Sequence, residues 1–229
     1  MYFYKNSFIN YFKMFQFTTA FFKFVIPFWM LIAGPDESGK EKFLIRFLNE
    51  YQTLMEPNPI SILYCYEKYN DNIQIMKQGG VNIHKGIPDD DLLNSLEKPT
   101  LLILDSLNVS QRFLITLKHK SIQTNISVMF LTKRFHDEIY SFGRFFKYIV
   151  LMRNQNLVKK LYDDPRTFSP DQVRHLDEAY RLATLNSDGY LVINKHPSFN
   201  VEYLTNIFEE PDNEEFSIFV PKTNNTLRL

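Results

Sequence analysis

Apolar runs alternate with segments of helical periodicity along most of the chain. Several runs are apolar nearly throughout, as expected for strands that are buried on both faces of a parallel sheet. These runs are 28–33, 60–66, 100–105, 126–131 and 148–152. Between the first two runs, apolar residues recur at helical spacing over 40–54, which predicts an amphipathic helix. Repetition of strand, helix and strand predicts an α/β fold, with a mostly parallel sheet and helices on both faces.

The same pattern predicts further elements toward both ends of the chain. Residues 171–185 have helical periodicity behind a Ser-Pro start, and 190–193 form an apolar run that predicts a sixth strand. Residues 216–220 predict a short edge strand. Two interpretations remain open for residues 1–22, namely an amphipathic or partner-binding helix and a poorly ordered extension.

The stretch from Met14 to Ala33 is apolar enough to be considered as a membrane span, with Lys23 as its single charge. Pro27 interrupts this stretch, and Gly34 begins a turn directly after it. We therefore predict that Phe24 to Ala33 forms the buried first strand of the sheet, and we expect no membrane partner.

Composition narrows the class of protein. A chain of 229 residues suits one α/β domain, and 45% hydrophobic with 23% charged residues is ordinary for a globular protein. Basic and acidic residues balance at 26 each, so contact with nucleic acid would need a local basic patch. Cys65 is the single cysteine, which excludes an internal disulfide and fits an intracellular location (nucleus, cytoplasm or virion) rather than secretion.

A phosphate-binding loop is the strongest chemical signal. The segment 34–41 matches the pattern GxxxxGK[ST] at every position but the last. In such a loop backbone N–H groups face the phosphates, the helix N-terminus adds positive potential, and lysine reaches the β- and γ-phosphates. The predicted ATP-binding residues are Gly34, Pro35, Asp36, Glu37, Ser38, Gly39, Lys40 and Glu41. A strand-to-helix turn without a ligand is the alternative.

Two acids in this loop depart from the usual pattern. Glu41 stands where a Ser or Thr hydroxyl would bind Mg²⁺, and Glu37 stands where a small residue is usual. Both add negative charge beside a polyanion, and Coulomb repulsion at close range is unfavourable even in water. We therefore predict weakened nucleotide binding.

Asp105 closes the run 100–105 as a Walker B acid closes its strand, and it is the predicted Mg²⁺ ligand and catalytic acid. The next residue is Ser106, where ATPases of this kind carry a second acid that activates water. Lys133 is a second catalytic candidate, as a sensor of the γ-phosphate. Arg144 and Arg153 are candidates for action across a subunit interface.

The order of these segments over residues 27–209 resembles the FtsK/HerA-type genome-packaging ATPases of Maverick/Polinton elements and adintovirus-like DNA viruses. The matching stretches are 27–28, 34–40, 62–66, 81–88, 101–105, 125–132, 148–151 and 189–193. The resemblance implies a subunit that binds ATP and Mg²⁺, assembles into a homo-oligomeric ring and translocates double-stranded DNA.

Departures from the family pattern fall on its functional positions. Besides Glu41 and Ser106, Lys133-Arg134 replaces a Gln-Asn sensor pair, and 121–124 replaces a segment with paired histidines. Asn156 stands where the resemblance places an arginine finger. The strand residues match the family pattern, whereas the catalytic positions differ from it. This contrast predicts that the fold is retained and that hydrolysis is lost.

Two functions are open on this basis. One is a divergent packaging-type ATPase of a DNA virus or virus-derived mobile element, with weak or absent hydrolysis. The other is a non-catalytic pseudo-ATPase that acts as a structural or partner-binding module. A membrane-anchored protein, with 14–33 as the span, is a third interpretation. The predicted organisation is an aromatic-rich extension (1–23), a P-loop NTPase-like domain (24–209) and a C-terminal tail (210–229).

Overall fold

The structure is a computed structural model, and it describes residues 12–18, 22–133, 142–154, 170–197, 202–208 and 215–221. Its strands are β1 (Phe12–Thr18), β2 (Phe24–Val25), β3 (Trp29–Ala33), β4 (Met55–Glu56), β5 (Ser61–Tyr66), β6 (Asn82–Lys85), β7 (Thr100–Asp105), β8 (Ile126–Thr132), β9 (Tyr148–Met152), β10 (Tyr190–Asn194), β11 (Glu202–Thr205) and β12 (Glu215–Pro221). Its helices are α1 (Lys40–Leu54), α2 (Asn72–Gln78), α3 (Asp90–Ser95), α4 (Gln111–Gln123) and α7 (Pro170–Ala183), with a short 3-10 helix η2 (Gly143–Phe145).

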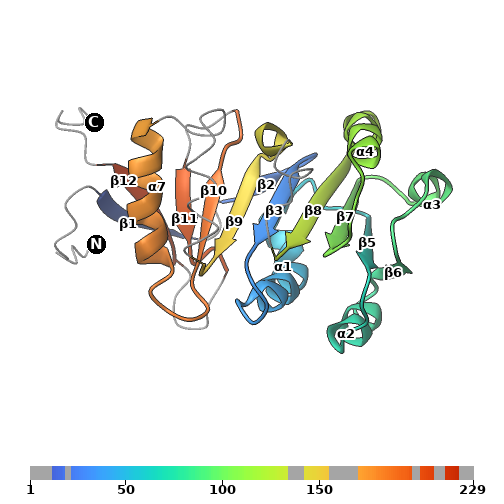
Figure 1. The fold of residues 1–229 in the computed structure, drawn as a ribbon, viewed down its shortest axis with the longest axis horizontal. Helices are drawn as coiled ribbons and strands as arrows, with labels where there is room; N and C mark the ends of the chain where they lie inside the picture. Colours follow the sequence, from blue (N-terminus) through green and yellow to red (C-terminus); the bar gives the residue numbers. More distant parts are fainter. Residues whose placement is uncertain are drawn as a thin grey trace.

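One sheet runs through the whole described part of the molecule, in the strand order β1-β12-β11-β10-β9-β3-β8-β7-β5-β6 (Figure 1). The strands from β9 to β6 in this order are parallel to one another. The strands from β10 to β1 continue the sheet with antiparallel pairing. The predicted α/β fold with a mostly parallel sheet is therefore confirmed.

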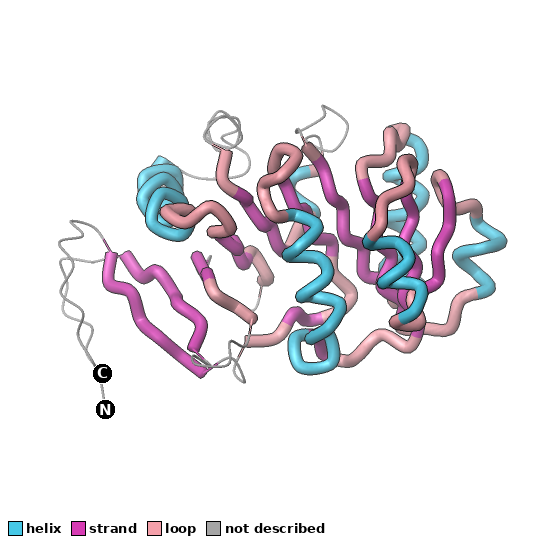
Figure 2. Tube along the Cα trace, turned by 90° about the horizontal axis from the view of Figure 1, so that it is seen from below, coloured by secondary structure: helices cyan, strands magenta, loops and turns pink. Residues whose placement is uncertain are grey.

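Two apolar layers hold the helices against the sheet. Along β3, Trp29, Leu31 and Ala33 point to a cluster that includes side chains of α3, α4 and α7. The alternate residues of the same strand, Met30 and Ile32, point to a second cluster with side chains of α1 and α2. This period of two explains why the run is apolar throughout: both faces of the strand are covered. Helices lie on both sides of the strands (Figure 2).

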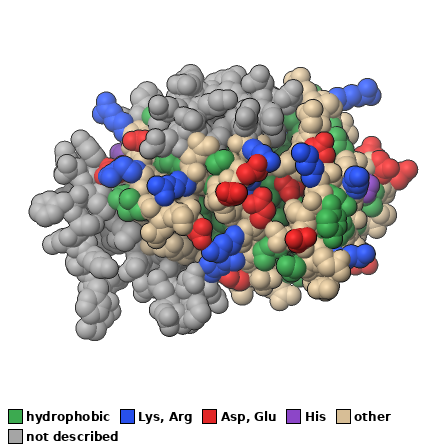
Figure 3. All heavy atoms as spheres, turned by 60° about the horizontal axis from the view of Figure 1, so that its bottom comes forward, with side chains coloured by type: hydrophobic (Ala, Val, Ile, Leu, Met, Phe, Trp, Pro, Cys, Tyr) green, Lys and Arg blue, Asp and Glu red, His purple; other side chains and the backbone are tan. Residues whose placement is uncertain are grey.

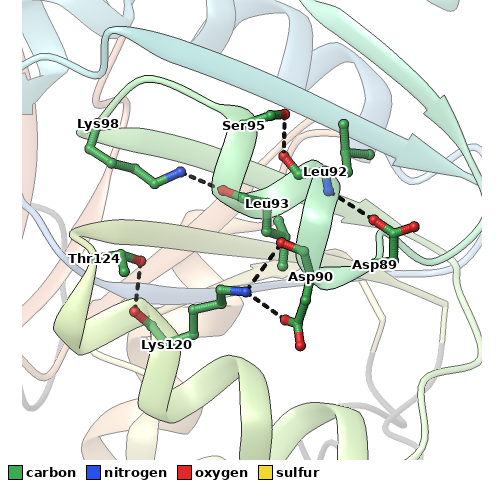
Figure 4. Close-up of polar contacts among 8 residues, drawn as sticks. All are labelled: Asp89, Asp90, Leu92, Leu93, Ser95, Lys98, Lys120 and Thr124. Carbon is green, nitrogen blue, oxygen red and sulfur yellow. Dashed lines mark hydrogen bonds and ion pairs between the residues drawn. The ribbon is translucent and has the colours of Figure 1, made fainter.

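Polar contacts fix α3 at the end of the parallel half of the sheet (Figure 4). The carboxylate of Asp89 accepts a hydrogen bond from the backbone N–H of Leu92 at 2.8 Å, which caps the first turn of α3. Lys120 of α4 donates to the carboxylate of Asp90 at 2.5 Å and so joins the two helices. These contacts tie the α3–α4 layer together at its solvent side.

The apolar runs predicted as strands are β3, β5, β7, β8 and β9, and the predicted helices are α1 and α7. The prediction of one strand from Phe24 to Ala33 is wrong. The chain forms β2, breaks at Ile26-Pro27, and resumes as β3, while β2 pairs with β4 outside the main sheet. Proline has no N–H to donate to a ladder, which explains the break.

The two ends of the described chain lie side by side. β1 pairs with β12 over its whole length, from Phe12 opposite Pro221 to Thr18 opposite Glu215. Residues 12–18 thus form a strand where the sequence left a helix or a loose extension open, and β12 is not at the edge, because β1 covers it. β1 and β12 belong to the predicted extension and tail, yet they continue the central sheet. The domain boundaries themselves stay a prediction.

No helix in the described part of the chain is long and apolar enough to cross a membrane. The described residues of the stretch 14–33 belong to β1, β2, β3 and their connections.

Phe47 is a test of the α1 layer, because its side chain is fully buried (0% exposed) and packs 5.5 Å from the ring of Phe24. We expect Phe47→Ala to lower the free energy of unfolding by about 3–5 kcal/mol, since it removes a buried ring and leaves a cavity. Urea denaturation measures this change. The control is Asn49→Ala, on an exposed position of the same helix, which should stay within about 0.5 kcal/mol. Equal effects of the two substitutions would contradict the assigned packing.

Candidate functional site

The phosphate-binding loop and Asp105 are brought together at the carboxyl edge of the parallel strands. β8 lies between β3 and β7, with Ala33 opposite Thr132 and Asp105 opposite Leu131. The backbone N–H of Gly34 donates to the carbonyl oxygen of Thr132 at 3.1 Å. The loop therefore begins directly beside the end of β8, and Asp105 lies on the other side of the same strand, as ligand sites in open α/β sheets require.

The loop has a shape that two of its glycines make possible. A Cβ on Gly34 would lie 2.4 Å from Ser38 Oγ and 2.5 Å from Met152 Cβ, closer than atoms pack. Gly39 has a φ of 92°, in the left-handed region, and α1 begins at the next residue. The side chain of Ser38 is only 6% exposed, and its Oγ has no hydrogen-bond partner among the described residues. A buried polar atom without a partner at the N-terminus of a 15-residue helix fits an anionic ligand.

Lys40 is turned back onto the loop. Its side chain is 1% exposed, and Nζ donates to the carbonyl oxygens of Gly34 and Pro35, at 2.5 Å in each case. Burial lowers the pKa of Lys40, while the negative charges of Glu41, Asp36 and Asp105 oppose that shift. A phosphate that binds here would replace the two carbonyl oxygens as the acceptor.

Lys133, the residue that follows β8, contacts the loop at Asp36. Its Nζ lies 2.7 Å from Oδ2 of Asp36. This hydrogen bond lowers the pKa of Asp36 and raises the pKa of Lys133. Lys133 is therefore placed beside the loop, although its partner in the structure is an acid of the loop itself. Arg134, its neighbour in the sequence, lies outside the described residues.

Asp105 is held by two hydroxyl groups. Ser106 Oγ donates to Oδ1 at 3.0 Å, and the hydroxyl of Tyr64 donates to Oδ2. Burial, together with the charge of Asp105, raises the pKa of Tyr64, so its hydroxyl stays protonated and acts as a donor. Tyr64 was not predicted as a site residue; the available signal is that it is one of two tyrosines in the strand that pairs with β7.

Carboxylate oxygens are ligands that Mg²⁺ accepts, so Asp105 fits this ion by chemistry. For Asp105 the ion would compete with two hydroxyl donors. Among the described residues no group of three or more His, Cys, Asp or Glu side chains could hold a metal ion. Magnesium here would therefore depend on phosphate oxygens and water for most of its ligands, which is its usual mode in nucleotide sites.

The remaining candidate cations, Arg153 and Arg144, lie at opposite ends of the parallel strands. Arg153 directly follows β9, whose carboxyl end lies beside that of β3, so it shares the edge of the loop. Arg144 lies in η2, just before β9, and thus at the opposite edge, where its guanidinium stacks 4.8 Å from the ring centre of Phe145. Asn156, at the predicted finger position, lies outside the described residues. Figure 3 shows acidic and basic side chains intermingled over the face that it presents, so no single charge dominates there.

The chain matches no family model and no curated protein. Solved structures share its fold. The genome packaging NTPase B204 from Sulfolobus turreted icosahedral virus 2, in complex with AMPPCP, has a TM-score of 0.50 and 14% identity over 77% of this chain and 96% of that chain. Its complex with ATP-gammaS has a TM-score of 0.49, with 14% identity over 77% and 96% of the two chains. For B204, the DNA-packaging ATPase from Sulfolobus turreted icosahedral virus, the TM-score is 0.48, with 13% identity over 78% and 97%.

At such identities the likeness concerns the fold. It agrees with the predicted α/β fold with a mostly parallel sheet. An origin in a Maverick/Polinton element or an adintovirus-like virus stays a prediction.

The Asp36–Lys133 pair generates a prediction on titration. Because the pKa of Asp36 is lowered from its ordinary value of 3.8, the pair stabilises the fold above that value, and this contribution is lost as the pH falls through the lowered pKa. We expect Lys133→Gln to return the pKa of Asp36 toward its ordinary value, as measured by carbon-13 NMR of the carboxyl group. Lys42→Gln, on a lysine that does not act on Asp36, is the control. An unchanged titration in Lys133→Gln would show that the pair does not form in solution.

Proposed function

We propose that the protein binds the phosphates of ATP at residues 34–41, and that it is a divergent packaging-type ATPase of a DNA virus or virus-derived element, with weak or absent hydrolysis. The observation that carries this proposal is the buried, unpartnered Oγ of Ser38 inside a glycine-dependent loop at the N-terminus of α1. The shared fold with a packaging NTPase that has been solved with AMPPCP supports it.

The residues of the loop have separate tasks in this proposal. Backbone N–H groups at the start of α1 and the hydroxyl of Ser38 donate to phosphate oxygens. Lys40 exchanges the carbonyl oxygens of Gly34 and Pro35 for the β- and γ-phosphates. Lys133 exchanges Asp36 for the γ-phosphate, which makes it the sensor of the third phosphate.

Asp105 would hold Mg²⁺ in this arrangement. When bound, the ion would neutralise charge on the phosphate oxygens. A water-activating base is harder to assign. Ser106 stands in place of the second acid, and its hydroxyl hydrogen is given to Asp105. Asp105 itself accepts hydrogen bonds from Ser106 and Tyr64, so both of its carboxylate oxygens already have a donor. Binding with poor turnover follows from these contacts.

A second candidate is a pseudo-ATPase that serves as a structural or partner-binding module. The double hydroxyl contact on Asp105 favours it, since both carboxylate oxygens already serve as hydrogen-bond acceptors within the protein. In both forms of the proposal, assembly into a homo-oligomeric ring and contact with double-stranded DNA follow from the resemblance to packaging ATPases.

The binding step is tested by Lys40→Ala. We expect this change to abolish binding of a fluorescent ATP analogue, with and without Mg²⁺, because Lys40 is the cation that the loop motif assigns to the phosphates. Fluorescence titration of the purified protein measures the affinity. Lys85→Ala removes the same charge from an exposed position of β6 and should leave binding unchanged. Unaltered binding in Lys40→Ala would show that the loop is not the site.

The catalytic step is tested by phosphate release. We expect turnover far below about one per second, a rate that working enzymes reach. An arginine finger alone contributes about 10³- to 10⁵-fold, so the missing groups have a large effect. The assay is run with double-stranded DNA and at protein concentrations that permit assembly, with Asp105→Ala as the matched variant. Turnover of about one per second or faster that Asp105→Ala removes would leave the active motor as the only reading.

A further inference from the structure

A groove of about 690 Å³ opens beside the phosphate-binding loop. Its walls come from the first turns of α1, the end of α7 with the turn that follows, the start of β10, the end of β11 and Phe219 of β12. Gly39 belongs both to the loop and to the lining of the groove. A ligand whose phosphates lie at the N-terminus of α1 can therefore continue into the groove without leaving the protein surface.

The floor of the groove is aromatic and fixed in place. The ring of Phe43 meets the ring of Tyr190 at 5.0 Å and the ring of Phe208 at 4.9 Å, both in edge-to-face geometry. The hydroxyl oxygen of Tyr190 accepts a hydrogen bond from the backbone N–H of Ile207 at 3.0 Å. A rigid apolar floor loses little entropy when a flat ring system is placed near it.

The rim of the groove is polar. Lys42 Nζ lies 2.5 Å from Oδ2 of Asp188, and the guanidinium of Arg46 lies 4.7 Å from the ring centre of Phe208. Within the described residues, Oδ1 of Asp188 has no hydrogen-bond partner and can accept one. A carboxylate at the rim of a nucleotide groove is suited to the hydroxyl groups of a ribose, which donate to it.

We propose that this groove binds the nucleoside half of a ribonucleoside triphosphate, with Asp188 as the acceptor for the ribose hydroxyls. The proposal rests on the proposed function, because the phosphates of the same ligand would occupy the loop. Three properties favour a nucleoside over other occupants: the groove continues from the loop through Gly39, its floor is aromatic and apolar, and its rim offers a carboxylate. Lys42 holds that carboxylate in place.

The test compares ATP, dATP and inorganic tripolyphosphate by calorimetric titration. For the natural sequence we expect ATP to bind at least tenfold more tightly than tripolyphosphate, and several-fold more tightly than dATP, since a hydrogen bond to a charged group contributes about tenfold or more. In Asp188→Ala the preference for ATP over dATP should disappear. Affinity for tripolyphosphate should not fall, because the substitution removes an acid near a polyanion.

Ratios of affinities serve as the readout, because a general change in charge acts on all three ligands alike. Asp91→Ala, which removes an exposed acid of α3, is the control and should keep the ratios of the natural sequence. Equal affinities for ATP and tripolyphosphate in the natural sequence would contradict the nucleoside site in the groove, but they would still agree with phosphate binding at the loop. An unchanged preference for ATP over dATP in Asp188→Ala would overturn the role of Asp188. Failure of all three ligands to bind would overturn the proposed function and this inference together.

Discussion

Hydrogen bonds to the end of β8 set the geometry on which the candidate site depends. The N–H of Gly34 donates to Thr132 O, and the N–H of Ser106 donates to Leu131 O. The donors belong to the segments that follow β3 and β7, and β8 between them is buried along its whole length. The loop and the acid thus meet because three strands end in register. A slip of one residue in any of them would turn its side chains to the other face and separate the two halves of the site.

This constraint explains how the shape of the site persists beside altered chemistry. Glu37 has a φ of 61° and Ser106 has a φ of 55°, in the left-handed region that favours glycine. Such conformations are unfavourable by about 1–3 kcal/mol and persist where the surrounding structure determines them. Here the packed strands hold the backbone of Glu37 and Ser106 in these conformations. Acidic and hydroxyl residues can therefore occupy these positions while the backbone keeps the path that the proposed phosphate site requires.

The sequence predicts those elements of the fold that depend on neighbouring residues in the chain. The central strands, α1 and the loop follow from apolar runs and a short motif, because each depends on neighbours in the sequence. The pairing of β1 with β12 does not, since it joins the two ends of the described chain and no local signal reports it. The same holds in the site: the motif predicts where Lys40 lies, but the contacts of Asp36 with Lys133 and of Asp105 with Tyr64 arise only when distant strands meet.

The charges within the loop limit how much the phosphates of a nucleotide can contribute to its affinity. Lys40 and Lys133, two described cations that contact the loop, have acceptors already, Lys40 in two carbonyl oxygens and Lys133 in Asp36. A phosphate would therefore replace existing bonds, and the gain is the difference between two sets of contacts. Glu41 reduces this difference further by repulsion. If phosphates contribute little net affinity, the nucleoside half must contribute more, and the aromatic floor beside Gly39 is the surface where that contribution can be made.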